Sequence, residues 1–169
     1  QPLERWNFNL HEQTVFFETR TICGSETIFK AWQGLLDNYW RTNGHREKLF
    51  RSVKQDYENF LKTCLNNPAE PDLKRDFGGI REYTFLYWLA AIAGKTIPQV
   101  LKPEEYKIFR QALEFLWLLR DAVHHVSGRD ENKLTKNLQT KLPMALNLEK
   151  LQILMHGMHQ FCFFGVQKL

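Results

Sequence analysis

Apolar residues recur at intervals of three and four positions over most of this chain, which is the spacing of one face of an α-helix. The pattern predicts helices over residues 25–41, 44–65, 79–93, 103–126, 134–145 and 148–167. No stretch alternates apolar and polar residues for long enough to predict a sheet, and no internal repeat is present. We therefore expect an all-α fold, a helical bundle of about six helices.

Residues that cap or break helices mark several of these helix ends. Ser25 can cap the first helix, Pro103 suits the first turn of the fourth, and Gly128 ends that helix. The helix over 79–93 has almost no polar face, so we expect it at the centre of the core. The helix over 25–41 carries one apolar face, made of Ile28, Phe29, Trp32, Leu35, Leu36 and Tyr39.

Length and composition fit one domain of a larger protein. The 169 residues can bury a core, and the chain begins at Gln1 rather than at methionine. We expect residues 1–169 to be a single helical domain excised from a larger multidomain enzyme. The sequence holds no transmembrane run, and its three cysteines, Cys23, Cys64 and Cys162, are far apart. A reducing, cytoplasmic location with no membrane partner is the simplest interpretation.

The net charge of +4 is mildly basic, and part of it gathers around residues 41–54. Such a patch can bind nucleic acid, but Glu47, Asp56 and Glu58 interrupt it, as in an ordinary solvated helix. We therefore do not expect nucleic acid as a partner. A basic surface equally suits a nucleotide or an acidic protein.

The most distinctive segment is residues 71–82, where a charged turn and a glycine pair open onto the apolar helix. Gly78 and Gly79 allow a tight backbone, and a helix start presents unpaired N–H groups between Lys74 and Arg81. This combination suits phosphate or carboxylate binding. The alternative is a plain turn, pinned by pairing of Arg81 with Asp76 or with neighbours of Glu82.

The histidines allow a zinc cluster to be imagined, because His156 and His159 share a helical face. No carboxylate or thiol is arranged beside them in the sequence. We expect no metal site, a packed core position for His159, and a structural role for His124 next to Arg120.

Segment 71–82 resembles a motif of the protein-PII uridylyltransferase/uridylyl-removing enzymes and of the related glutamine-synthetase adenylyltransferases. The matching residues are Lys74, Gly78, Gly79, Ile80, Arg81 and Glu82, whereas Arg75, Asp76 and Phe77 depart from the pattern. The resemblance continues upstream through Glu18, Arg20, Ile22, Gly24, Ile28 and Phe29. It continues downstream through residues 116–120, His124, Gly128, Arg129, Lys133, Leu134, Gln139 and Met155. It spans roughly residues 14–161, and its second half favours the uridylyltransferase branch.

The resemblance implies a helical domain between the nucleotidyltransferase and His-Asp (HD) domains of an enzyme that acts in nitrogen signalling. That enzyme would transfer a uridylyl group from UTP to a PII-type protein, using magnesium held by its core. This chain lacks both catalytic centres: Gly24-Ser25 is followed by Asp37 without an acidic partner, and no His-Asp pair occurs. We expect no catalytic residue and no cofactor in the chain itself.

The resemblance makes Lys74, Gly78, Gly79, Arg81 and Glu82 candidates for contact with the substrate or with another domain. Arg120 and Arg129 come second, since they either clamp phosphate or pair internally with acids such as Glu82 and Asp130. Two other functions stay open. One is the adenylyltransferase branch, and the other is a non-catalytic module that only binds a protein partner.

Overall fold

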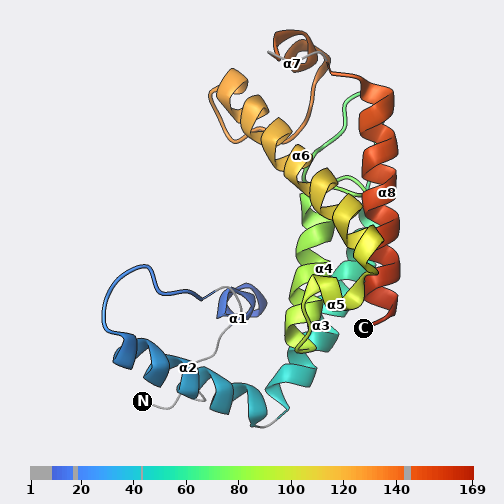
Figure 1. Cartoon of the computed structure of the whole chain (residues 1–169). Coiled ribbons are helices and arrows are strands. Elements are labelled where there is room, and N and C mark those ends of the chain that lie inside the picture. The colour runs from blue at the N-terminus through green and yellow to red at the C-terminus, as the bar shows by residue number, and fades with distance from the viewer. Residues whose placement is uncertain (1–8, 17–18, 43, 143–145) are drawn as a thin grey trace.

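The computed structural model describes residues 9–16, 19–42, 44–142 and 146–169 (Figure 1). Within these ranges the regular secondary structure consists of α-helices alone. The helices are α1 (Leu10–Val15), α2 (Glu26–Arg41), α3 (His45–Thr63), α4 (Ile80–Ile92), α5 (Ile97–Val100), α6 (Pro103–Ser127), α7 (Lys136–Lys141) and α8 (Leu148–Gln167). The all-α prediction is confirmed. The described ranges hold eight helices rather than about six, because the short helices α1 and α5 lie outside the predicted stretches.

The capping residues act as their types predict. The Ser25 side chain accepts a hydrogen bond from the N–H of Ile28 at the start of α2, and Pro103 is the first residue of α6. Gly128 ends α6 with φ of +68°, a left-handed conformation that favours glycine. Helix α7 is shorter than the predicted 134–145, because its N-cap Thr135 and its C-cap Leu142 both have extended backbone. Residues 143–145 of that prediction lie outside the described residues.

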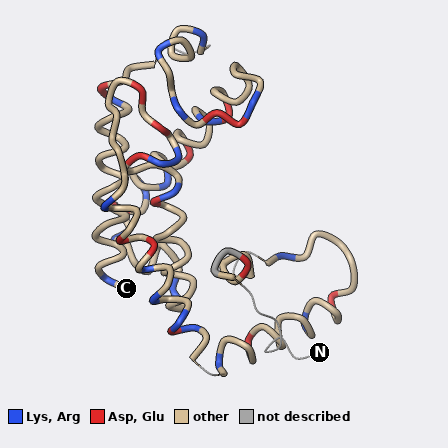
Figure 2. Tube along the Cα trace, turned by 180° about the vertical axis from the view of Figure 1, so that it is seen from behind, with Lys and Arg blue, Asp and Glu red and all other residues tan. Residues whose placement is uncertain are grey.

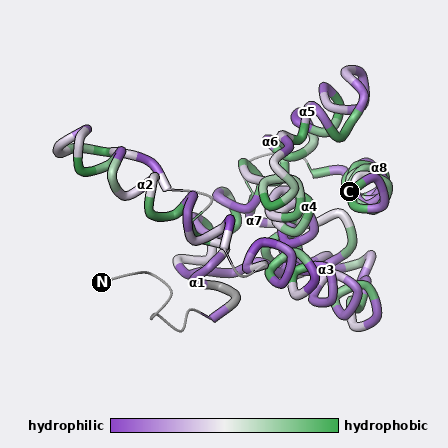
Figure 3. The backbone as a smooth tube through the Cα atoms, turned by 90° about the horizontal axis from the view of Figure 1, so that it is seen from below, coloured by the Kyte–Doolittle hydropathy of each residue, from purple (hydrophilic) through white to green (hydrophobic). Residues whose placement is uncertain are grey.

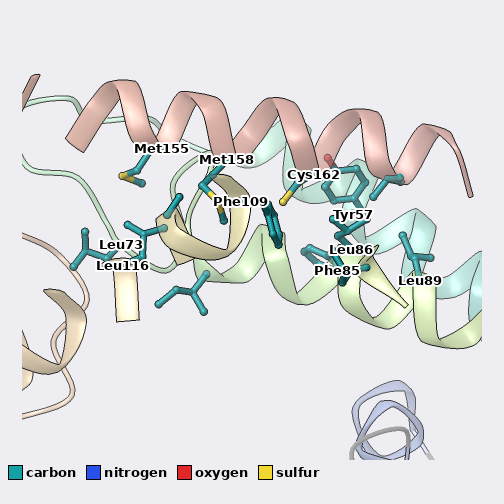
Figure 4. Packing of buried hydrophobic residues seen from close by; sticks show 14 of the residues in the cluster. Tyr57, Leu73, Phe85, Leu86, Leu89, Phe109, Leu116, Met155, Met158 and Cys162 are labelled. Atoms are coloured by element: carbon teal, nitrogen blue, oxygen red, sulfur yellow. The ribbon is translucent and has the colours of Figure 1, made fainter. Parts of the chain in front are cut away.

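Helix α4 lies at the centre of the molecule, as its lack of a polar face predicts, and packs against α3, α5, α6 and α8. Figure 4 shows Met158 and Cys162 of α8 pointing toward Phe109 of α6 and Leu86 of α4. Leu86, Leu116 and Cys162 have no exposed surface. The core is therefore shared by α3, α4, α6 and α8, and hydrophobic residues are prominent on α4 and α8 (Figure 3).

Helix α2 extends sideways from this bundle (Figures 1 and 3). Only Leu36 and Tyr39 of its apolar face are buried, in a small cluster with neighbouring aromatic side chains. Ile28 and Leu35 stay 72% and 50% exposed. The predicted apolar face is thus real but is covered only toward the C-terminal end of the helix.

Two loops meet at the end of the bundle where α4 begins. The loop before α4 and the loop after α6 form an antiparallel bridge between Asp72 and Lys133. Leu73 donates its N–H to the carbonyl of Asn132 at 2.9 Å, and Leu134 donates to Pro71 at 2.8 Å. This pairing fixes the charged loop against a distant part of the chain. Separately, none of the described helices has the length and apolar character needed to cross a membrane.

Candidate functional site

Two carboxylates hold the charged loop before α4 in a fixed shape. Asp72 Oδ1 accepts the N–H groups of Lys74 and Arg75 at 2.9 and 2.8 Å, and Asp76 Oδ2 accepts that of Asp72 at 2.9 Å. Asp76 is only 4% exposed, and burial raises the pKa of its carboxyl group above the ordinary value. The carboxylates of Asp72 and Asp76 therefore accept hydrogen bonds from the backbone of their own loop and hold it in shape.

The glycine pair lets the loop approach α8 and the preceding turn. Gly78 has φ of +73°, and a Cβ atom added there would lie 1.7 Å from the carbonyl oxygen of Met155. At Gly79 an added Cβ would lie 2.9 Å from the carbonyl oxygens of Asp76 and Leu73. Close packing inside the domain is a sufficient reason for both glycines.

The N–H groups at the start of α4 are already bonded, which corrects the expectation that they are unpaired. Those of Gly79, Ile80 and Arg81 donate to the carbonyls of Asp76, Leu73 and Lys74 at 2.9, 3.0 and 2.8 Å. The N–H of Gly78 donates to Glu82 Oε2 at 2.8 Å. An anion at this loop would therefore have to be held by side chains.

Glu82 is fully buried and joins α3, the loop, α4 and α8. Besides the N–H of Gly78, it accepts the hydroxyl of Tyr57 at 2.9 Å, and Nδ1 of His159 lies 2.8 and 3.0 Å from its two oxygens. Burial, and then the Glu82 carboxylate, raise the pKa of Tyr57 far above the ordinary value. The ring of His159 also packs against Phe77, but its side chain is partly exposed and lies against the Glu82 carboxylate. The predicted packing of His159 is therefore confirmed, whereas the expectation that no carboxylate lies beside it is wrong.

Three basic side chains of this region, Lys74, Arg75 and Arg81, form no ion pair with any carboxylate of the described residues. We call them the cationic face. The guanidinium of Arg81 lies over the rings of Phe85 and Trp88, with Cζ at 5.3 and 5.9 Å from the ring centres. The alternative in which Arg81 pairs with a nearby acid is therefore not what the structure shows.

The cationic face borders a hollow of about 710 Å³ between the end of α3 and the loops at the start of α4. The hollow also contains acids, but each has a partner: Glu70 pairs with Lys133 at 3.1 Å, and Asp72 and Asp76 bind the loop backbone. In Figure 2 acidic and basic residues alternate along these loops. The excess positive charge therefore resides on the cationic face.

Arg120 and Arg129 both have internal partners. Arg120 donates to Asn132 at 2.7 Å and to Asp130 at 3.0 Å, and Nε2 of His124 lies 3.1 Å from the same Asp130 oxygen. Arg129 pairs with Glu131 at 2.8 Å and is largely exposed. Neither arginine pairs with Glu82, and His124 does lie beside Arg120.

The structure thus divides the predicted contact residues. Gly78, Gly79 and Glu82 are buried and act inside the domain, whereas Lys74 and Arg81 reach the hollow with their charges unpaired. Arg75 joins them, although the sequence marked it only as a departure from the family motif. The positive charge of Arg75 was the signal in the sequence that could have identified it as a contact residue.

No metal site is visible in the part of the chain that the structure describes, where no three His, Cys, Asp or Glu side chains group together. Gly24 has φ of +116° and Ser25 caps α2, so this pair forms the predicted turn and cap. Glu18, which contributes to the upstream resemblance, lies outside the described residues.

Comparison with known proteins gives consistent similarities. The sequence pattern of the GlnD PII-uridylyltransferase family matches residues 47–161. The bifunctional uridylyltransferase/uridylyl-removing enzyme of Novosphingobium aromaticivorans is 31% identical over 151 residues, which are 80% of this chain and 16% of that protein. The enzyme of the same name from Azospirillum brasilense is 36% identical over 143 residues, 77% of this chain and 15% of that protein. No solved structure matches the chain.

Proposed function

Because this chain belongs to the GlnD PII-uridylyltransferase family, we propose that it works as the helical domain of a bifunctional uridylyltransferase/uridylyl-removing enzyme in nitrogen signalling. The chain covers 16% of the length of the Novosphingobium relative, so the catalytic centres would lie in other domains. Those domains are the nucleotidyltransferase core, with its magnesium and UTP, and the HD domain. The PII-type protein would be the substrate, in the cytoplasm.

Within that enzyme, the cationic face would contact the nucleotidyltransferase core and help shape its cleft. The observation that carries this proposal is the unpaired charge of Lys74 and Arg75 on the loop and of Arg81 in the first turn of α4. Asp72, Asp76 and Glu82 hold this region in a fixed shape. Preorganised cations favour a phosphate or a facing carboxylate, because the loop loses little freedom on binding. Arginine over aromatic rings is suited to planar anions.

The uridylyltransferase branch is favoured over the adenylyltransferase branch. The family pattern that matches, and the relatives named above, are all uridylyltransferases. No observation specifically favours the other alternative, a non-catalytic module that only binds a protein partner.

The test is substitution of the cationic face in the full-length parent enzyme. Lys74→Ala and Arg81→Ala should lower the rate of PII uridylylation by about tenfold or more, since each charge-assisted contact contributes roughly 1.5–3 kcal/mol. In this chain, Lys74→Ala should shift stability by less than about 1 kcal/mol, because surface charges contribute little. Arg81→Ala should cost about 0.5–2 kcal/mol, because the Arg81 guanidinium lies over the rings of Phe85 and Trp88.

Arg51→Ala and Lys107→Ala are matched controls, because both side chains are exposed on α3 and α6 away from the loop. They should change neither rate nor stability. Unchanged uridylylation by the Lys74 and Arg81 variants, together with a large loss of melting temperature, would make the cationic face structural.

A further inference from the structure

Most of the charges around the hollow beside the cationic face are already engaged inside the domain. Four basic and three acidic side chains are among the residues that line it. Glu70 and Lys133 offset each other, because their side chains form an ion pair at 3.1 Å. The carboxylates of Asp72 and Asp76 accept hydrogen bonds from the loop backbone. The charges left for a ligand are therefore those of the cationic face.

The backbone of this loop is poorly suited to a phosphate. Phosphate sites at helix starts rely on several free backbone N–H groups. Here the N–H groups of Lys74 and Arg75 donate to Asp72 Oδ1, and those of residues 78–81 donate to acceptors within the domain. The three acids of the lining also repel a phosphate group, which carries nearly two negative charges at neutral pH. A carboxylate, with a single charge, suits the same cations better.

Apolar side chains adjoin the cations at the end of α3. Leu65, two residues after this helix, is 87% exposed, and the half-buried ring of Phe60 also lines the hollow. A protein segment combines carboxylates with apolar side chains, whereas a phosphate has no apolar part. The volume of about 710 Å³ accommodates a group of several side chains rather than a lone anion.

We propose that an acidic segment of the nucleotidyltransferase core of the parent enzyme docks in this hollow. An Asp or Glu of that segment pairs with Lys74 and Arg81, and an apolar neighbour covers Leu65. Charge complementarity selects this occupant, because unpaired cations on an ordered loop favour an acidic chain. The inference rests on the proposed function for the identity of the partner. It adds the chemistry of the contact, a carboxylate rather than a phosphate.

Zero-length cross-linking of the full-length parent enzyme tests the proposal. A water-soluble carbodiimide joins a lysine amine to a carboxylate where the two are in contact, and mass spectrometry identifies the linked peptides. Lys74 should be linked to an Asp or Glu of the nucleotidyltransferase core. Lys133 should be linked to Glu70, its ion-pair partner, which provides an internal positive control. Lys107, exposed on α6, should not be linked to the core.

A pair of leucine variants tests the apolar part of the contact. Leu65 and Leu118 are 87% and 65% exposed, so neither Leu65→Ala nor Leu118→Ala should disturb the fold. Leu65→Ala should lower the yield of the Lys74 cross-link by about threefold or more, because it removes apolar surface that the segment covers. Leu118→Ala, on α6, is the matched control and should leave the yield unchanged.

A charge exchange separates a carboxylate partner from a phosphate ligand. Lys74→Glu alone should lower the rate of uridylylation about tenfold or more, because it places two like charges in contact. Replacing the cross-linked acid of the core by lysine in the same enzyme should restore most of that rate. Failure of this second change to restore any rate would overturn the proposal, since a bound phosphate gives no such rescue.

The cross-links also distinguish this proposal from the proposed function. The proposal is overturned if Lys133 is linked to Glu70 while Lys74 is linked to nothing outside this chain, or to the PII-type protein alone. If Lys74→Ala then still lowers the uridylylation rate, the cationic face keeps its proposed function without the acidic segment. A link from Lys74 to the core, with an unchanged rate in Lys74→Ala, would support the docking and contradict the proposed function.

Discussion

Gly78 and Glu82 show how one segment combines packing and surface roles at the scale of single residues. Both were predicted as contact residues, yet Gly78 touches α8 and Glu82 binds Tyr57 and His159 inside the core. Charge and glycine spacing drew attention to the segment. They could not show which residues face inward, because His159 lies 77 positions from Glu82 along the chain. Only the folded packing brings the two together.

Gly78→Ala should destabilise the chain by about 3 kcal/mol or more. The added methyl group would overlap the Met155 carbonyl at 1.7 Å, and alanine is disfavoured at φ of +73°. Gly157→Ala, on α8 with open space around it, is the matched control and should be neutral or stabilising by up to about 1 kcal/mol. Urea unfolding measures the free energy of unfolding of both variants. Equal stability of the two would contradict the close approach of Gly78 to the Met155 carbonyl.

At the scale of helices, apolar periodicity predicted the long elements well. Helices α2, α3, α4, α6 and α8 lie within about two residues of their predicted bounds, because each spans several turns of a consistent pattern. Helices α1 and α5 are too short for such a pattern. Their capping boxes, Asn9 with Glu12 and Thr96 with Gln99, were the available signals. Periodicity also could not tell that α2 has little to pack against.

Helices α2 and α4 should therefore respond differently to the loss of an apolar side chain. Leu89→Ala in α4 should cost about 2–5 kcal/mol, because Leu89 is fully buried in the core. Ile28→Ala in α2 should change stability by less than about 0.5 kcal/mol, because Ile28 is 72% exposed. Chemical denaturation measures the free energy of unfolding of both variants against the unsubstituted chain. A large, concentration-dependent loss in the Ile28 variant would show that α2 is covered by a second copy of the chain.

At the scale of the whole molecule, the region that matches the family begins in α3 and ends in α8. These are the helices that share the main core, while α2 packs chiefly through its own small cluster. The sequence could predict the helical class and the central place of α4. It could not predict which side chains share the hollow beside the cationic face, because Phe60, Lys74 and Lys133 come from separate segments that only the bundle brings together.

The three cysteines differ in burial, from exposed to fully buried, and their alkylation rates should fall in the same order. Cys23 is exposed, Cys64 is half-buried, and Cys162 is fully buried between α8 and its neighbours. Burial raises the pKa of Cys64 to about 11 and holds that of Cys162 well above its ordinary value. A raised thiol pKa means that the protonated, unreactive form persists to higher pH.

Iodoacetamide should therefore label Cys23 first, Cys64 slowly and Cys162 only on unfolding. At pH 8 about one Cys64 side chain in a thousand is a thiolate, so its labelling should speed up about tenfold for each pH unit until about pH 11. Mass spectrometry of the three peptides follows the order, with the guanidinium-unfolded chain as the control in which the differences disappear. Labelling of Cys162 as fast as Cys64 in the folded chain would mean that α8 does not close the core as described, and the placement of His159 on Glu82 would fall with it.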